Sequence, residues 1–371
     1  MQKRVFVLLL LLLLSYDGIS YQPVGLHNAA FSKTLSVIFD TDMGPDYDDV
    51  GAITLLHAFA DSGKVKILAT MASDKYEGVA GVLSLFNTYF GRPDIPIGVP
   101  KGAAVDQRDW QHWTDTILAK YPHALRRNEE AADAVMLYRK ILAGQPDGSV
   151  VIITVGFLTN LAGLLQSGPD VYSPLNGLEL VKKKVKRLVS MAGSFPTGRE
   201  FNVWKDADAS KYVFSYWPTA VLFSGVEIGR NIKTGLALVQ DETISNSPVK
   251  DVFRICLPMA VEDHGGRSSW DETAVLVGVA GYEGYFGVRK GRIRVEADGS
   301  NSWEEAGEGG QEKKDGNRGM KDGNQGVKDG THEKGEITQE TGRPVQEYLL
   351  AVRPEAEIGR VIDGLMKHRP R

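Results

Sequence analysis

Short, almost wholly apolar runs recur along this chain and alternate with segments whose apolar residues follow a helical spacing. Such runs, without polar alternation, are typical of strands buried on both faces of a parallel sheet. Helices are expected between them, among them 50–60 and 129–143. The alternation predicts one α/β domain over 35–297, with an open, mostly parallel sheet flanked by helices. The runs predicted as strands are Leu35–Phe39, Val65–Met71, Val150–Val155, Val185–Met191 and Ala220–Phe223.

Residues 298–344 break this pattern with a Gly-, Asp- and Lys-rich stretch that repeats every seven residues from Lys314. Two interpretations are open: a calcium-binding repeat that resembles a β-roll, or a solvated, disordered insertion. We expect disorder, because the units lack the apolar residue that stacked repeats would bury. A strand at 345–352 and a helix at 355–367, which make up the C-terminal part 345–367 of the same domain, are predicted after it, so the insertion is expected to interrupt one domain.

The N-terminus has the layout of a secretory signal. Two basic residues precede the ten apolar residues Val5–Leu14, and small residues follow at Gly18 and Ser20. This layout predicts a signal peptide at 1–20 and a secreted protein, extracellular or periplasmic, with no membrane attachment after cleavage. An uncleaved anchor is the alternative, but these apolar residues are too few to span a hydrocarbon core of roughly 30 Å.

The net charge and the cysteine count limit which ligands and which cysteine chemistry are expected. The formal net charge of −4 gives no basic field for nucleic acid, so small neutral or cationic ligands fit better. The single cysteine, Cys256, excludes an intrachain disulfide. A nucleophilic thiol is one interpretation of Cys256. Its apolar run is typical of a helix facing a core, so we expect a small buried hydrophobe instead.

An acidic segment directly follows the first predicted strand. Asp40 and Asp42 are two residues apart on an extended chain, which places their carboxylates on one side. Asp46, Asp48 and Asp49 follow a Gly-Pro turn where the next helix is expected to begin. Carboxylates crowded at the carboxyl end of a buried strand are costly unless a cation neutralises them, and oxygen-only ligands suit Ca²⁺. The alternative is a helix cap among scattered surface acids.

Four ordered segments of the chain together resemble the inosine-uridine-preferring nucleoside hydrolase family. The resemblance covers roughly Ser36 to Ala297 and the C-terminal strand and helix. It implies an N-ribohydrolase that uses calcium to hydrolyse the N-glycosidic bond of a ribonucleoside or related ribosyl compound, and it allows a homo-oligomer. The segments are Val37–Asp42 with Asp48 and Asp49, Ile152–Asn160, Met191–Ser194 followed by Glu200–Asn202, and Ser269–Asp271.

The resemblance also implies a metal centre and a general base. Calcium would be held by the carboxylates of Asp42, Asp49 and Asp271 and by the backbone carbonyl of Val155. Asp42 would be the general base as well, because N-glycosidic hydrolysis passes through an oxocarbenium-like state and needs an activated water.

Contacts to the sugar are implied for a second set of polar residues, with Asp40 behind the metal ligands. Glu200 and Asn202 have an alternative as loop residues that hydrogen-bond their own backbone. Asp74 falls near a family asparagine that touches the sugar. The residues implied to contact the substrate are Asp48, Asp74, Ser194, Glu200 and Asn202.

The chain departs from the family pattern in ways that bear on catalysis. The acidic segment is two residues longer than the common form, so Asp46 has no sure counterpart and could replace or support a metal ligand. Trp270 stands where many members carry a histidine that protonates the leaving base. Trp270 could stack on a purine or merely pack in the core. His264 is a candidate replacement acid, although a loop histidine is more often solvated. Ser194 replaces a common asparagine.

Three rival interpretations stay open. In a haloacid-dehalogenase-like phosphatase, Asp40 would attack phosphorus and magnesium would be the ion, but Gly44 and the lack of a later acidic cluster argue against it. In a catalytically impaired binding protein, the calcium and ribosyl pocket would persist without turnover, which the missing histidine makes credible. Calcium could also serve structure alone, with Asp42 important for stability rather than turnover.

Overall fold

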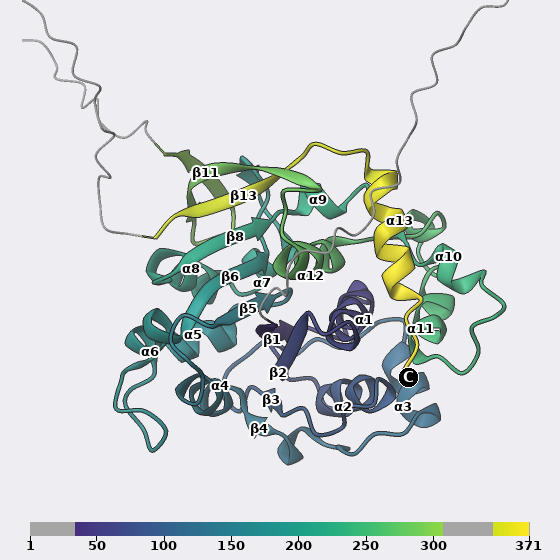
Figure 1. The fold of residues 1–371 in the computed structure, drawn as a ribbon, viewed down its shortest axis with the longest axis horizontal. Helices are drawn as coiled ribbons and strands as arrows, with labels where there is room; N and C mark the ends of the chain where they lie inside the picture. The colour runs from purple at the N-terminus through teal and green to yellow at the C-terminus, as the bar shows by residue number, and fades with distance from the viewer. Residues whose placement is uncertain (1–33, 307–343, 371) are drawn as a thin grey trace, which may run out of the picture. The chain divides into compact units, whose positions relative to one another are not determined.

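The computed structural model describes residues 34–306 and 344–370 (Figure 1). The signal peptide predicted at 1–20 and residues 307–343 of the predicted insertion lie outside these residues. The predictions for both segments therefore stay predictions. Within 34–306 and 344–370, no helix has the length and apolar character that crossing a bilayer requires.

One sheet of 11 strands forms the centre of the domain, in the order β4-β3-β2-β1-β5-β6-β8-β13-β11-β12-β7. Neighbouring strands from β4 to β13 pair in parallel, and β11, β12 and β7 add antiparallel pairs at one end. This confirms the predicted open, mostly parallel sheet. The strands are β1 (Leu35–Thr41), β2 (Val65–Ala72), β3 (Ile97–Val99), β4 (Ala132–Asp133), β5 (Val150–Thr154), β6 (Val185–Met191), β7 (Thr197–Gly198), β8 (Ala220–Ser224), β11 (Phe286–Val295), β12 (Asn301–Glu305) and β13 (Gln346–Ala351), with β9 (Lys233–Thr234) and β10 (Arg267–Ser268) in a separate two-stranded sheet.

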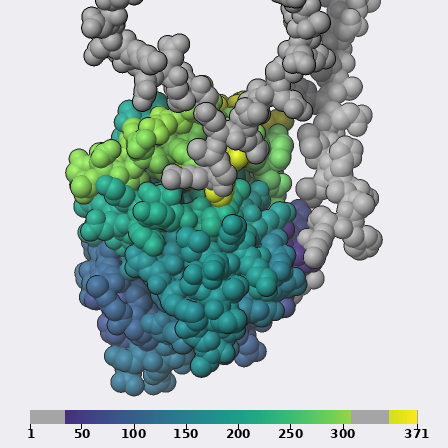
Figure 2. All heavy atoms as spheres, turned by 90° about the vertical axis from the view of Figure 1, so that its left-hand side faces the viewer, coloured from purple at the N-terminus to yellow at the C-terminus, as the bar shows by residue number. Residues whose placement is uncertain are grey.

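Helices cover both faces of the sheet, so each central strand is buried on two sides (Figure 1). Val37 and Phe39 of β1 pack into one core with α1, α2, α11 and α12, whereas Ile38 packs into the other with α4, α5, α6 and α8. The side of the molecule that carries α5, α6 and α8 is the teal face of Figure 2. The helices are α1 (Asp48–Asp61), α2 (Val79–Tyr89), α3 (Trp113–Lys120), α4 (Ala134–Ala143), α5 (Thr159–Gln166), α6 (Gly177–Lys184), α7 (Phe201–Lys205), α8 (Ala207–Tyr216), α9 (Val226–Gly229), α10 (Leu236–Val239), α11 (Pro248–Cys256), α12 (Trp270–Ala280) and α13 (Glu355–Met366).

Two predicted boundaries are wrong. The helix expected from residue 129 begins at Ala134, because the Asp133 side chain accepts a hydrogen bond from the Met136 N–H and caps it there. The insertion expected from residue 298 starts later, because β12 pairs with β11 and carries the folded domain to at least Ala306. Buried Cys256 lies in α11 as predicted.

The topology brings several loops together at the carboxyl end of β1. This strand lies between β2 and β5. The Ser73 N–H donates to the Thr41 carbonyl at 2.8 Å, and the Val155 N–H donates to the Asp40 carbonyl, also at 2.8 Å. The chain then turns and begins α1 at Asp48. The acidic segment therefore lies where open α/β sheets bind their ligands.

Candidate functional site

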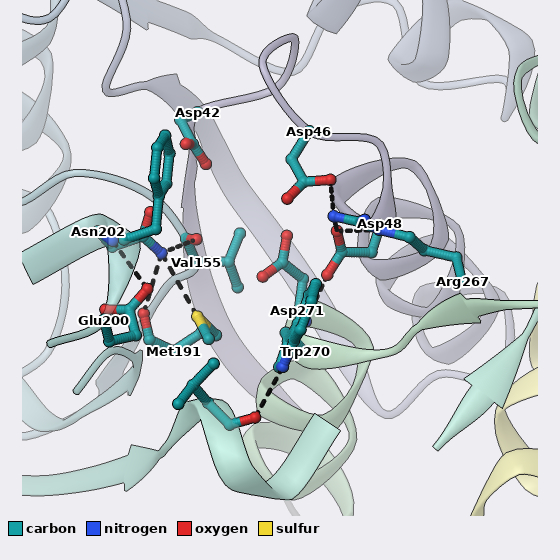
Figure 3. A pocket seen from close by; sticks show the side chains of 12 residues that line it. Asp42, Asp46, Asp48, Val155, Met191, Glu200, Asn202, Arg267, Trp270 and Asp271 are labelled. Carbon is teal, nitrogen blue, oxygen red and sulfur yellow. Dashed lines mark hydrogen bonds and ion pairs between the residues drawn. The ribbon is translucent and has the colours of Figure 1, made fainter. Parts of the chain in front are cut away.

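A cavity of about 270 Å³ opens above the carboxyl ends of β1 and β5 (Figure 3). Its walls come from the acidic segment, from the loops after β5, β6 and β8, and from the start of α12. Carboxylates dominate the polar lining, and Arg267 is the one cationic side chain among the lining residues. The lining consists of Asp42, Asp46, Asp48, Val155, Met191, Glu200, Phe201, Asn202, Val226, Arg267, Trp270 and Asp271.

Asp49 lies in the first turn of α1, fully buried behind the cavity lining. Its Oδ1 accepts a hydrogen bond from the Thr41 hydroxyl. Its Oδ2 is buried and has no hydrogen-bond partner among the described residues. Burial, more than neighbouring charge, raises the pKa of Asp49 to about 7. An orphaned carboxylate oxygen in this position calls for a cation.

Asp271, in the first turn of α12, meets Asp48 and Asp49 although more than 200 residues separate them. One carboxylate oxygen from each of the three lies within 4.8 Å of the others. Asp42 stands outside this trio but lines the same cavity. Burial first, and then neighbouring carboxylates, raise the pKa values of Asp42 and Asp271 well above their ordinary range. Of the carboxylates predicted as ligands, Asp42 and Asp271 therefore line the cavity, whereas Asp49 is buried beside Asp271 and Asp48.

The other wall of the cavity carries Asn202 and Glu200 (Figure 3). The Asn202 amide donates to the Val155 carbonyl at 2.8 Å and to the Met191 carbonyl at 3.2 Å. The Val155 oxygen keeps a second lone pair for a cation. Glu200 caps α7, and its two oxygens accept from the N–H groups of Gly193, Asn202 and Val203. Its carboxylate thus orients the loop as well as lining the cavity.

Trp270 forms part of the cavity lining rather than the core alone. Its Nε1–H donates to the Val226 carbonyl at 2.7 Å, which fixes the indole in place. The guanidinium of Arg267 lies 4.9 Å from the indole ring centre. A fixed aromatic ring in a cavity of this size suits contact with a planar base.

Three residues predicted from the sequence lie outside the cavity lining. Asp74 is buried, but its carboxylate accepts from the Tyr76 and Gln107 N–H groups and so holds a loop. Ser194 is fixed by hydrogen bonds with Asn301. His264 is exposed after a short 3-10 helix, so the geometry gives no support to its predicted role as leaving-group acid.

Asp40 is fully buried beneath the site and does not line the cavity. Its carboxylate accepts from the Tyr138 hydroxyl at 2.8 Å and from the Asn160 amide at 3.1 Å. Such a group cannot reach a phosphoryl substrate, so the position argues against the phosphatase alternative. It agrees with a supporting role behind the metal ligands.

The comparisons with known proteins agree with this site. A family model described as inosine-uridine preferring nucleoside hydrolase matches residues 37–338. The chain belongs to this family. As a nucleoside hydrolase family member it falls in the predicted class of enzymes, the N-ribohydrolases.

The relatives and solved structures that match this nucleoside hydrolase family member share little sequence identity with it. A pyrimidine-specific ribonucleoside hydrolase, RihA, of Citrobacter koseri is 27% identical over 248 residues, covering 62% of this chain and 72% of RihA. The solved plant nucleoside hydrolase PpNRh1 has a TM-score of 0.63 at 19% identity, covering 90% of this chain and 98% of the plant chain. A purine-preferring ribonucleoside hydrolase from Gardnerella vaginalis has a TM-score of 0.61 at 16% identity, covering 90% and 99%. These structures confirm the fold.

In the metal-free protein, buried carboxyl groups are expected to make the free energy of unfolding depend on pH. Burial is the largest cause that raises the pKa values of Asp40, Asp74 and Glu200 to about 7 each. Between about pH 4 and 7 the folded state keeps protons that the unfolded state has lost, so the free energy of unfolding falls as pH rises. Carboxyls with lowered pKa values, such as Asp170 at about 2, titrate below this window.

We therefore expect the melting temperature in chelator to fall by several degrees between pH 5 and pH 7.5. Differential scanning fluorimetry measures this directly. Added calcium should flatten the slope, because metal ligands lose their protons on binding. A melting temperature that rises over this range in chelator would contradict the prediction.

Proposed function

We propose that the protein catalyses calcium-dependent hydrolysis of the N-glycosidic bond of a ribonucleoside or related ribosyl compound, releasing the base and ribose. One observation carries the proposal. Asp42 and Asp271 line the cavity, Asp49 is buried beside Asp271, and none of the three has an ion-pair partner among the described residues. The family to which the chain belongs supplies the reaction class.

The residues present fit calcium. All the donors are oxygens: three carboxylates and the Val155 carbonyl. Asp49 Oδ2 has no hydrogen-bond partner within 34–306 and 344–370 and would gain the ion as a partner. Hard cations prefer such ligands, and calcium tolerates irregular geometry better than magnesium. When bound, the ion would offset the carboxylate charge and make a nearby water more acidic.

Asp42 is suited to be the general base. Its carboxylate lines the cavity and has no ion-pair partner among the described residues, so it is placed to accept the proton of the attacking water. Asp48 and Asn202 lie on opposite sides of the cavity, so they can hold sugar hydroxyls between them (Figure 3). The acidic lining also favours the positive charge that develops on the sugar ring.

Trp270 is proposed to contact the leaving base, because its ring is fixed in the cavity lining by the Val226 hydrogen bond. The lining contains no histidine, which keeps one alternative open: a protein that binds a ribosyl ligand with calcium but does not turn it over. Export of the protein and its self-association also remain proposals, resting on the N-terminal sequence and the family resemblance.

The test is a panel of purine and pyrimidine ribonucleosides and their 5′-monophosphates, assayed with the purified protein for free reducing sugar. We expect hydrolysis of at least one nucleoside with calcium and a loss of at least ~100-fold after chelation. Monophosphates should react at least ~10-fold more slowly, because the lining is acidic. Nucleoside binding without sugar release would establish the binding protein instead. Phosphate release from the monophosphates would establish the phosphatase.

A further inference from the structure

Arg267 is a cavity residue whose role the family resemblance does not assign. It lies on β10, which pairs with β9 in the separate two-stranded sheet. Its guanidinium makes ion pairs with Asp46, Asp48 and Asp263. Its side chain is only 12% exposed. A buried guanidinium that forms ion pairs with three carboxylates fixes the positions of those carboxylates in the site.

The contacts of Arg267 divide the site's carboxylates into two groups. Asp46, Asp48 and Asp263 have the guanidinium as a counter-ion, whereas Asp42 and Asp49 have no ion pair among the described residues. Asp48 decides between the two groups. Its distance from Asp49 and Asp271 alone would make it a metal ligand, but its hydrogen bonds indicate another role. Both of its oxygens are already engaged. Oδ1 accepts from Arg267 Nε at 3.2 Å and from an Arg267 terminal nitrogen at 3.1 Å, and Oδ2 faces the Asp271 N–H at 3.3 Å.

Two residues of the longer acidic segment, Asp46 and Tyr47, contact the Arg267 guanidinium. Asp46 accepts a hydrogen bond from Arg267 (Figure 3). The Tyr47 ring centre lies 4.8 Å from the guanidinium carbon, and the Tyr47 hydroxyl donates to Asp263 at 2.7 Å. With Trp270 also 4.9 Å away, the cation lies close to two aromatic rings and three acids. Asp46 therefore has a partner other than a metal ion.

We propose that Arg267 is a positioning residue that keeps Asp46 and Asp48 out of the metal's coordination shell. The ion is then left to Asp42, Asp49 and Asp271, and Asp48 stays turned toward the substrate's hydroxyls. This inference rests on the proposed function, since it presumes a calcium site in the same cavity. An anion-binding role for Arg267 is disfavoured, because three carboxylates already take up most of its five N–H donors.

The test is a double-mutant cycle in calcium affinity, measured by calorimetry on the calcium-depleted full-length chain. Asp48→Asn alone should weaken calcium binding clearly less than Asp49→Asn does, by about 100-fold at most, because Asp48 supports the ligand Asp271 without being a ligand itself. Arg267→Met should tighten binding at least ~10-fold, because a freed carboxylate joins the ion. Adding Asp48→Asn to Arg267→Met should reverse that gain. The double variant Arg267→Met/Asp46→Asn has the same net charge as the unsubstituted chain. If it also binds calcium more tightly, a purely long-range effect of charge is excluded.

Asp46→Asn provides a variant that tests the idea even if Arg267→Met does not fold, since Asp46 is 34% exposed at the cavity rim. It should weaken calcium binding by no more than about 10-fold, the lower end of the range for residues that only support metal ligands. The proposal is overturned if Asp48→Asn or Asp46→Asn weakens calcium binding as severely as Asp49→Asn, or if folded Arg267→Met binds no tighter. Absence of calcium binding in every variant would overturn this inference and the metal part of the proposed function together. If the calcium affinities follow the expected cycle but the protein releases no base from nucleosides, only the proposed hydrolysis is overturned.

Discussion

Asp49→Asn is expected to lower kcat/KM for ribonucleoside hydrolysis at least ~10³-fold, a loss of about 4 kcal/mol of transition-state stabilisation. In the part of the chain that the structure describes, the buried Oδ2 of Asp49 has no hydrogen-bond partner, and the carboxylate lies close to those of Asp48 and Asp271. An amide removes one negative charge and leaves an NH₂ group facing the ion. The rise in melting temperature on calcium addition should disappear with the activity, because binding to the folded state alone is what stabilises it.

A matched control separates the site from charge in general. Asp208→Asn makes the same chemical change on an exposed residue in the first turn of α8. It should leave turnover and the calcium-induced rise in melting temperature within experimental error. The assignment of Asp49 fails if folded Asp49→Asn keeps calcium affinity and turnover within ~3-fold of the unsubstituted chain. Without added metal, the variant should melt no lower than the unsubstituted chain, because it buries no charge.

The parallel strands could be predicted from the sequence because they are buried on both faces. Apolar residues then occupy several consecutive positions, as Val37, Ile38 and Phe39 do in β1. The antiparallel end of the sheet carries no such signal. β12 is a polar strand that pairs with β11 and with β7, and its Asn301 meets Gly198 from a segment more than 100 residues earlier. A pairing set by distant partners cannot be read from local composition.

The acidic segment of the candidate site was predictable from its place after a buried strand, whereas Asp271 was predicted only from the family resemblance. The loop after β1 and the start of α12 place Asp42 and Asp271 in the cavity lining, and the start of α1 places Asp49 beside Asp271. The loop between α11 and α12 was not predictable to the same depth. His264 and Arg267 are three residues apart, and the pairing of β10 with β9 places only Arg267 in the cavity lining. Its partner Asp46 was visible in the sequence, but the contact between them was not.

Gly156 is a position where the fold leaves no room for a side chain beside Asp42, the proposed general base. It follows β5 and sits between Val155 and Phe157. A Cβ there would lie 2.4 Å from the Asp42 backbone nitrogen, 2.9 Å from the Asp42 Cβ and 2.5 Å from the Ser73 hydroxyl. Real Cβ atoms do not approach backbone this closely, so Asp42 would have to move.

Gly156→Ala is therefore expected to lower kcat about 10²-fold, because displacing a base by about 1 Å is enough for such a loss. The loss of stability should be smaller, about 1–3 kcal/mol, as for other overpacked sites. Steady-state kinetics and denaturant unfolding on the same preparation measure both quantities. Gly168→Ala is the control, because a Cβ there meets nothing within 4 Å. If Gly156→Ala keeps kcat within ~3-fold while the protein is folded, the position of Asp42 does not govern turnover, and the base must be sought elsewhere in the cavity.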